Sequence, residues 1–109
     1  MLEAILGNST VEKILFFIET YGEGYAKGMA EVFDISVNGI QQQLKRLEDG
    51  GIIISLKLGK TRVYRFNPRY PFSKELKALI RKAFKFLPQK DIYAYYSKRT
   101  RPRRKGKPL

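Results

Sequence analysis

The chain has 109 residues with a formal net charge of +12, and it contains neither cysteine nor histidine. This length allows one small domain around a single core, and no apolar run is long enough for a transmembrane helix. Because the usual general base, the thiolate nucleophile and the soft-metal ligands are all missing, we expect no enzymatic activity, no metal site and no cofactor.

Two helices are predicted before residue 22. Residues 2–6 suit a short helix, and Ser9 and Glu12 have the spacing of a capping box at the start of a second helix that ends near Tyr21. One face of the second helix should point inward, through Val11, Ile14, Leu15 and Ile18. The run Gly22-Glu23-Gly24 then breaks the helical pattern.

Residues 25–49 have the pattern of a helix-turn-helix. Two apolar stripes recur at helical spacing: Ala26, Met29, Ala30 and Phe33, and then Val37, Ile40, Leu44 and Leu47. Between them, Asp34 and Ile35 suit a tight connection, and Ser36 is a good N-cap for the second helix. The polar residues of the second helix are left on the face opposite its apolar stripe.

An extended hairpin is predicted directly behind these helices. After Gly50-Gly51 the period changes from helical to extended, and Gly59-Lys60 lies where a two-residue hairpin turn is expected, so residues 52–66 should form a β-ribbon. We expect the apolar side chains of the ribbon to anchor it to the domain: Leu56, Leu58, Val63, Tyr64 and Phe66.

Ser73 is expected to cap a further helix that continues to about residue 87, and residues 89–97 to add one or two helical turns. The predicted fold class is therefore mainly α with a small β-hairpin: a winged helix-turn-helix of the α+β type, with a three-helix core, a wing and a C-terminal helix. Residues 1–88 would form the winged-helix domain with its dimerisation helix, and residues 89–97 a short aromatic extension. Residues 98–109, dense in positive charge, would form a basic tail that is flexible when unbound.

At this point the chain resembles a known family. The run AEVFDISVNGIQQQLKRLEDGGII resembles the helix-turn-helix of ArsR- and MarR-type winged-helix regulators, and LGKTRVYRFNP and PFSKELKALIRKAF resemble their wing and following helix. The resemblance implies a prokaryotic transcriptional regulator that dimerises through its first and last helices. Asp34 departs from the glycine that many relatives carry. Soft-metal sensing, a common ArsR activity, needs Cys or His ligands, so the chain would be a relative without metal ligands.

Polar side chains on the predicted recognition helix are candidates for reading DNA bases. The face opposite the apolar stripe holds Asn38, Gln42 and Lys45, flanked by Gln41 and Arg46. Asn and Gln can pair bidentately with adenine, and Lys can reach guanine acceptors or phosphate. Any amphipathic helix needs a polar face, but within a helix-turn-helix we favour base contact. Gly39 costs helix stability, and we expect it to permit close approach of the backbone to DNA.

Positive charge is concentrated in the second half of the chain. Residues 1–49 contain four Lys and Arg against eight Asp and Glu, whereas residues 50–109 contain eighteen against two. This asymmetry favours a polyanionic partner. The predicted contacts to phosphate or the minor groove are Lys57, Lys60 and Arg62 in the wing, and Arg99, Arg101, Arg103 and Arg104 in the tail. The tail resembles an AT-hook in which Thr100 replaces the central glycine, and a generic phosphate-binding arm is the favoured interpretation.

The expected function is sequence-specific binding of double-stranded DNA by a cytoplasmic, nucleoid-associated homodimer that represses transcription by occupying its operator. Helix 36–49 would read the major groove, and the wing and tail would hold the backbone or minor groove. The predicted dimer interface comprises Leu2, Ile5, Leu6, Leu76, Leu79, Ile80, Ala83, Phe84 and Leu87. Two alternatives stay open: a winged helix that binds RNA, and an interaction module that docks on a partner protein through the acidic first half and the tyrosine cluster.

Overall fold

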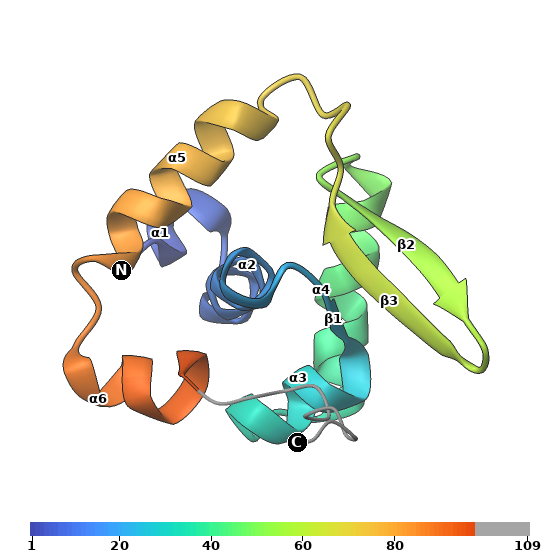
Figure 1. Ribbon diagram of the computed structural model, residues 1–109, viewed down its shortest axis with the longest axis horizontal. Coiled ribbons are helices and arrows are strands. Elements are labelled where there is room, and N and C mark those ends of the chain that lie inside the picture. The colour runs from blue at the N-terminus through green and yellow to red at the C-terminus, as the bar shows by residue number, and fades with distance from the viewer. Residues whose placement is uncertain (98–109) are drawn as a thin grey trace, which may run out of the picture.

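The computed structural model of the chain describes residues 1–97 and has the winged-helix fold expected from the sequence (Figure 1). Its elements, in chain order, are α1 (Glu3–Leu6), α2 (Ser9–Tyr21), β1 (Gly24–Tyr25), α3 (Ala26–Phe33), α4 (Val37–Asp49), β2 (Ile53–Leu58), β3 (Thr61–Phe66), α5 (Ser73–Phe84), α6 (Gln89–Asp91) and the π-helical turn η1 (Ile92–Tyr96). Helix α2 lies at the centre, α4 and the β2–β3 hairpin lie on one side of it, and α5 lies on the opposite side (Figure 1).

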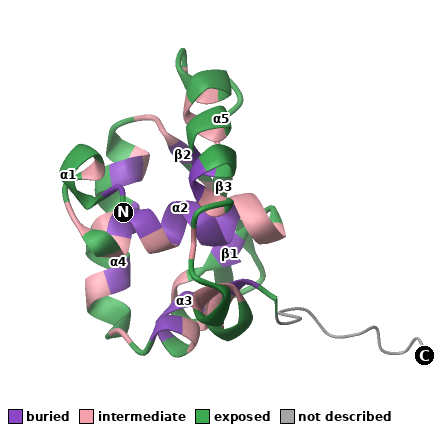
Figure 2. Cartoon of the chain, turned by 90° about the vertical axis from the view of Figure 1, so that its left-hand side faces the viewer, coloured by how far each residue is buried: buried purple, intermediate pink, exposed green. Residues whose placement is uncertain are grey.

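Helix α2 is buried on nearly all sides, as Figure 2 shows. The four residues predicted to point inward are buried, and so are Phe16 and Phe17 on the remaining faces. A helix that is apolar all round is expected where neighbours cover every face. The rest of the domain therefore packs around α2, which makes it the central element of the core.

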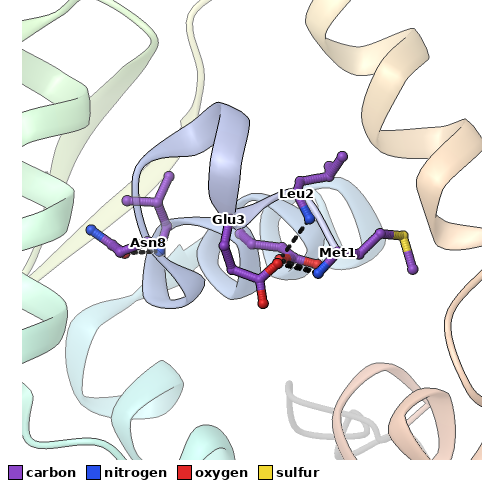
Figure 3. Close-up of polar contacts among 6 residues, drawn as sticks. Met1, Leu2, Glu3 and Asn8 are labelled. Atoms are coloured by element: carbon purple, nitrogen blue, oxygen red, sulfur yellow. Dashed lines mark hydrogen bonds and ion pairs between the residues drawn. The ribbon is translucent and has the colours of Figure 1, made fainter.

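The start of α2 differs from the prediction, because the N-cap is Asn8 and not Ser9. The Asn8 carboxamide accepts a hydrogen bond from the backbone N–H of Val11 at 2.8 Å (Figure 3). Glu12 does not complete a capping box. Its carboxylate is buried and accepts a hydrogen bond from the backbone N–H of Leu2 at 3.1 Å. Glu12 thus ties the segment before α1 to α2.

The helix-turn-helix is confirmed. Helix α3 ends at Phe33, and its C-cap, Asp34, adopts the left-handed conformation with φ 57°, which Asp tolerates better than most residues. Ser36 caps α4 as expected, since its hydroxyl accepts a hydrogen bond from the backbone N–H of Gly39 at 3.0 Å. A Cβ at Gly39 would lie 3.1 Å from the Ser36 hydroxyl, so this glycine has a local reason in the cap itself.

The hairpin is part of a three-stranded antiparallel sheet with the order β1-β3-β2. Strand β1 was not predicted, because it consists of only two residues that follow a glycine-rich break. It pairs Gly24 with Tyr64 and Tyr25 with Val63. A Cβ at Gly24 would lie 2.8 Å from the Phe17 ring, so only glycine allows the strand to pass this close to α2. The predicted turn at Gly59-Lys60 is confirmed, with Gly59 at φ 65°.

The prediction that all apolar wing residues anchor the hairpin is wrong for two of them. Val63 is buried, and Tyr64 and Phe66 are half-buried against the core. Leu56 and Leu58, by contrast, are about half exposed, at 48% and 51%. The alternation of a strand gives two faces. Leu56 and Leu58 share the outer face with Ile54, opposite the buried Ile53.

The C-terminal helices extend the core further than expected. Helix α5 begins at Ser73, which makes no capping bond, and ends at Phe84, three residues before the predicted end. After α6, η1 places Tyr96 in the core, where its ring lies 5.8 Å from that of Phe16 and 5.6 Å from that of Phe84. Burial raises the pKa of the Tyr96 phenol above its usual range. Residues 89–97, predicted to be an extension, therefore help to close the core around α2.

Candidate nucleic-acid interface

The five predicted base- or phosphate-contacting residues of α4 are all exposed. The stripe opposite them is buried at Ile40, Leu44 and Leu47, whereas Val37, which was predicted to belong to it, is 39% exposed in the first turn, so the prediction is wrong for that residue. Steps of four and three residues separate Asn38, Gln42 and Lys45, so these side chains lie in one line along the outer surface of the helix. The amphipathic division predicted from the sequence is therefore present.

Arg46 lies at the margin of this surface, next to α1. Its guanidinium approaches Gly7, where an added Cβ would lie 3.0 Å away, and one of its nitrogens lies 3.4 Å from the side-chain oxygen of Gln43. The same oxygen accepts a hydrogen bond from the Asn8 amide at 3.1 Å. Gln43 thus joins α4 to the start of α2 and is not part of the outer line. Arg46 is placed to reach a backbone phosphate beside that line.

The charges on α4 are unevenly distributed along its length. Residues 37–44 contain no charged side chain, whereas Lys45, Arg46, Glu48 and Asp49 all lie in the last turn and a half. Lys45 forms an ion pair with Asp49 at 3.0 Å, with both side chains largely exposed. An exposed pair of this kind contributes about 0–1 kcal/mol, so phosphate can compete with Asp49 for Lys45.

The wing places its predicted cations around the turn. Lys57 and Arg62 are cross-strand neighbours, and Lys60 lies in the turn between them; all three are exposed. Antiparallel neighbours lie about 4.5–5.5 Å apart at Cβ, so two like charges face each other here. Such a like-charge pair is destabilising unless an anion lies nearby. The tip is therefore positively charged on the side that carries Lys57 and Arg62.

A hydrogen-bonded chain connects this tip to α4. The Arg62 guanidinium donates to the Ser55 hydroxyl at 3.0 Å, and Ser55 donates to the Glu48 carboxylate at 2.7 Å. Partial burial and the nearby negative charge of Glu48 raise the pKa of Tyr64, whose strand neighbour is Ser55. The angle between α4 and the wing is thus fixed by side chains from three elements. The hydroxyl of Ser55 within the largely apolar run IIISLKL was the signal in the sequence, but its partners could not be deduced.

Two further contacts hold the hairpin to the rest of the domain. On the far side of the wing, Arg65 forms an ion pair with Glu23 at 3.0 Å, beside β1. At the base of the wing, the Asn67 amide donates to the carbonyl of Gly51 at 2.8 Å. No role was predicted from the sequence for Arg65 or Asn67. Both contacts brace the hairpin where it leaves the domain, and the turn projects beyond them (Figure 1).

The residues predicted to form a dimer interface fall into two groups. Leu2, Ile80 and Ala83 are buried within the chain itself, so core packing accounts for them and that part of the prediction is corrected. Ile5 is 70% exposed and Leu79 is 36% exposed, while the rest are half-buried against the core: Leu6, Leu76, Phe84 and Leu87. Two further exposed aromatic residues lie at the ends of α5, Phe72 and Phe86.

The predicted tail contacts Arg99, Arg101, Arg103 and Arg104 lie outside the described residues. Within residues 1–97, no cluster of three acidic side chains is arranged as a cation site. Across the same residues, none of the helices has the length and apolar character needed to cross a bilayer.

Comparisons with known proteins bear on the fold. No protein-family model and no curated protein matches the sequence. Among solved structures, the chain is similar to ZitR of Lactococcus lactis in its apo form, a double mutant, with a TM-score of 0.54. The two are 14% identical, and the alignment covers 78% of this chain and 73% of that one. At this identity the likeness concerns the fold, and it agrees with the winged-helix architecture described above.

Proposed function

We propose that the protein is a transcriptional regulator that binds double-stranded DNA in a sequence-specific manner, as a homodimer, with α4 in the major groove. The observation that carries this proposal is the line of Asn38, Gln42 and Lys45, fully presented on the second helix of a helix-turn-helix and fixed to a basic wing. In this motif the second helix enters the major groove and its N-terminal residues contact base edges. The fold positions neutral amides there and cations at the flanks.

In this arrangement each group has a distinct contact. Asn38 and Gln42, with Gln41 beside them, can pair with adenine edges, and Lys45 can reach guanine or phosphate. Arg46 reaches phosphate on the α1 side, and Lys57, Lys60 and Arg62 reach it on the wing side. The tail arginines, Arg99, Arg101, Arg103 and Arg104, add phosphate or minor-groove contacts. Occupation of an operator by such a domain would repress transcription.

The dimer is proposed to form through the exposed surface of α5. Exposed residues of α5 and its flanking turns lie on both sides of Leu79: Phe72, just before the helix, and Phe86, beyond its end, are each seven residues away, Glu75 is four residues before Leu79 and Lys82 three after. Two copies of α5 that run antiparallel, with the two-fold axis at Leu79, would place Phe72 against the partner's Phe86. They would also place Glu75 beside the partner's Lys82. Each of these two pairs would thus be complementary across the two-fold axis.

Selection of bound duplexes from a random library, followed by affinity measurements, tests the DNA-binding proposal. Gln42→Ala and Asn38→Ala should each weaken the selected site by about 1–3 kcal/mol while leaving the fold unchanged, because both side chains are exposed. Gln89→Ala, at an exposed glutamine on α6, is the matched control and should bind as wild type. Unchanged affinity in both α4 variants would remove the base-reading assignment. Preferential binding of structured RNA over any duplex would instead favour the RNA-binding alternative.

Charge exchange tests the dimer. Glu75→Lys places lysine against the partner's Lys82, so sedimentation should show weakened association, and Lys82→Glu should have a similar effect. The double variant Glu75→Lys/Lys82→Glu restores opposite charges and should recover the dimer. A protein that sediments as a monomer at micromolar concentration would contradict the proposal. The tail is tested by truncation after Ser97, which should flatten the salt dependence of binding by about 0.9 per lost phosphate contact.

A further inference from the structure

Strand β2 presents apolar side chains on the outer face of the wing up to its tip, which the proposed contacts to phosphate do not explain. On β3 the same face carries Arg65, the buried Val63 and Thr61. Ile54, Leu56 and Leu58 lie on this face, with exposed fractions that rise toward the turn, 40%, 48% and 51%. Tyr25 of β1 pairs with Val63 beside them and is also exposed. Contiguous exposed apolar side chains of this kind usually mark a binding surface.

The charges around the tip indicate what kind of partner can cover Leu58. Lys57 precedes it, Lys60 follows it in the turn, and Arg62 lies across the hairpin from Lys57. The apolar centre of a protein–protein interface is depleted in lysine, and the two exposed lysines close to Leu58, Lys57 and Lys60, would oppose such an interface. A DNA minor groove offers the complementary arrangement, because phosphates line its rims while its floor and sugar walls are less polar.

We infer that the wing inserts Leu58 into the minor groove as an apolar wedge that opens a base step and bends the DNA. Proteins that bind this groove frequently insert leucine, isoleucine, phenylalanine or proline between base pairs. The Leu58 side chain is the last one on the outer face before the turn, and its cross-strand neighbour is the small Thr61. It is therefore the outer-face apolar group nearest the turn. Lys60 lies in the turn, and Lys57 and Arg62 lie on the opposite face of the hairpin, from which they can contact the rims.

The dimensions of the hairpin require the DNA to change shape. Paired strands are about 4.7–4.9 Å apart before side chains are added, and the minor groove of B-DNA is about 6 Å wide. The ribbon can thus enter only where the groove widens, which happens most readily at flexible pyrimidine–purine steps. The Arg62–Ser55–Glu48 chain keeps the wing fixed to α4, so the position of the wedge is set by the bases that α4 contacts.

This inference rests on the proposed DNA binding, and the following experiment distinguishes a failure of the wedge from a failure of DNA binding. A selected duplex labelled at both ends reports bending by energy transfer, and 2-aminopurine placed at successive steps under the wing reports unstacking. Wild type should bend the duplex by about 20–90° and raise the fluorescence at one step. Leu58→Ala should lose most of the bend and the fluorescence increase. Leu56→Ala is the matched control: it has the same chemistry, face and similar exposure, one strand repeat further from the tip, and should retain both signals.

Lys60→Ala completes the set, because it should weaken binding and flatten its salt dependence while the remaining complex stays bent. Sequence-specific binding by wild type without a bend, or a bend that Leu58→Ala leaves intact, overturns the wedge and leaves the proposed function standing. If wild type binds no duplex, both proposals fall. If Leu56→Ala and Leu58→Ala both alter the sedimentation coefficient of the free protein and neither alters bending, the apolar face belongs to a protein interface and the wedge is refuted.

Discussion

The position of the α2 cap gives the sharpest test of the structure, because the sequence pattern and the coordinates assign it to adjacent residues. The capping-box pattern points to Ser9, whereas Asn8 makes the bond to the Val11 N–H at 2.8 Å. Replacing an Asn N-cap with Ala costs about 1 kcal/mol, within a range of about 0.5–2. Asn8 also donates to Gln43 at 3.1 Å, a partly buried hydrogen bond that adds about 0.5–1.5 kcal/mol.

Asn8→Ala should therefore lower the free energy of unfolding by about 1–3 kcal/mol. Ser9→Ala should change it by less than about 0.5 kcal/mol, since Ser9 is exposed and alanine is the better helix former. Urea denaturation measures both, and the slope with urea should be the same in all variants because the cores are unchanged. A double-mutant cycle with Gln43→Ala isolates the bond between α2 and α4. Equal losses of stability in Asn8→Ala and Ser9→Ala, or a larger loss in Ser9→Ala, would falsify Asn8 as the N-cap.

Three further predictions concern the supports of the site. Gly24→Ala should destabilise the domain by about 1–3 kcal/mol in thermal unfolding, because its Cβ would lie 2.8 Å from the Phe17 ring. Ser55→Ala removes both hydrogen bonds of the Arg62–Ser55–Glu48 chain and should lower the free energy of unfolding by about 1–2 kcal/mol. In the complex with DNA, this variant should make the position of the bend less well defined, and this effect should be larger than the loss of affinity. Tyr96→Phe should be close to neutral at pH 7. Since burial raises the pKa of Tyr96 in the folded state, wild-type stability should be retained below pH ~10 and fall above it, and this fall should be smaller in Tyr96→Phe.

Periodicity in the sequence predicted the helices well because their burial follows from local spacing. The end of α2, the boundaries of α4 and the turn at Gly59-Lys60 are all as expected. Strand β1 could not be found in this way, because two residues have no detectable period. The predicted N-cap of α2 was wrong by one residue, since Asn8 and Ser9 are both good N-cap residues and only the backbone conformation decides between them.

The sequence predicted less well which face of a helix or strand packs against the core, because this depends on the tertiary structure. In the wing, strict alternation identified two sets of side chains but could not show that Leu56 and Leu58 point outward. In α5, Ile80 and Ala83 belong to the core of the monomer, whereas Leu79, adjacent to Ile80 in sequence, is exposed. The wide apolar stripe of α5 thus contains both residues that pack in the core and residues that stay exposed. Only the positions of the neighbouring elements show which residues are which.

The distribution of charge along α4 has a consequence for how affinity and specificity arise. The first two turns carry no charged side chain, so in the proposed complex they would discriminate bases but add little general attraction to phosphate. Cations begin at Lys45, where Asp49 partly offsets them, and continue on the wing. Changes at Asn38 or Gln42 should therefore alter which sequences are bound without changing the salt dependence, whereas changes at Lys57 or Lys60 should do the reverse. Since the Glu48–Ser55–Arg62 chain begins at the end of α4, it joins the helix proposed to select the site to the wing proposed to hold the DNA backbone.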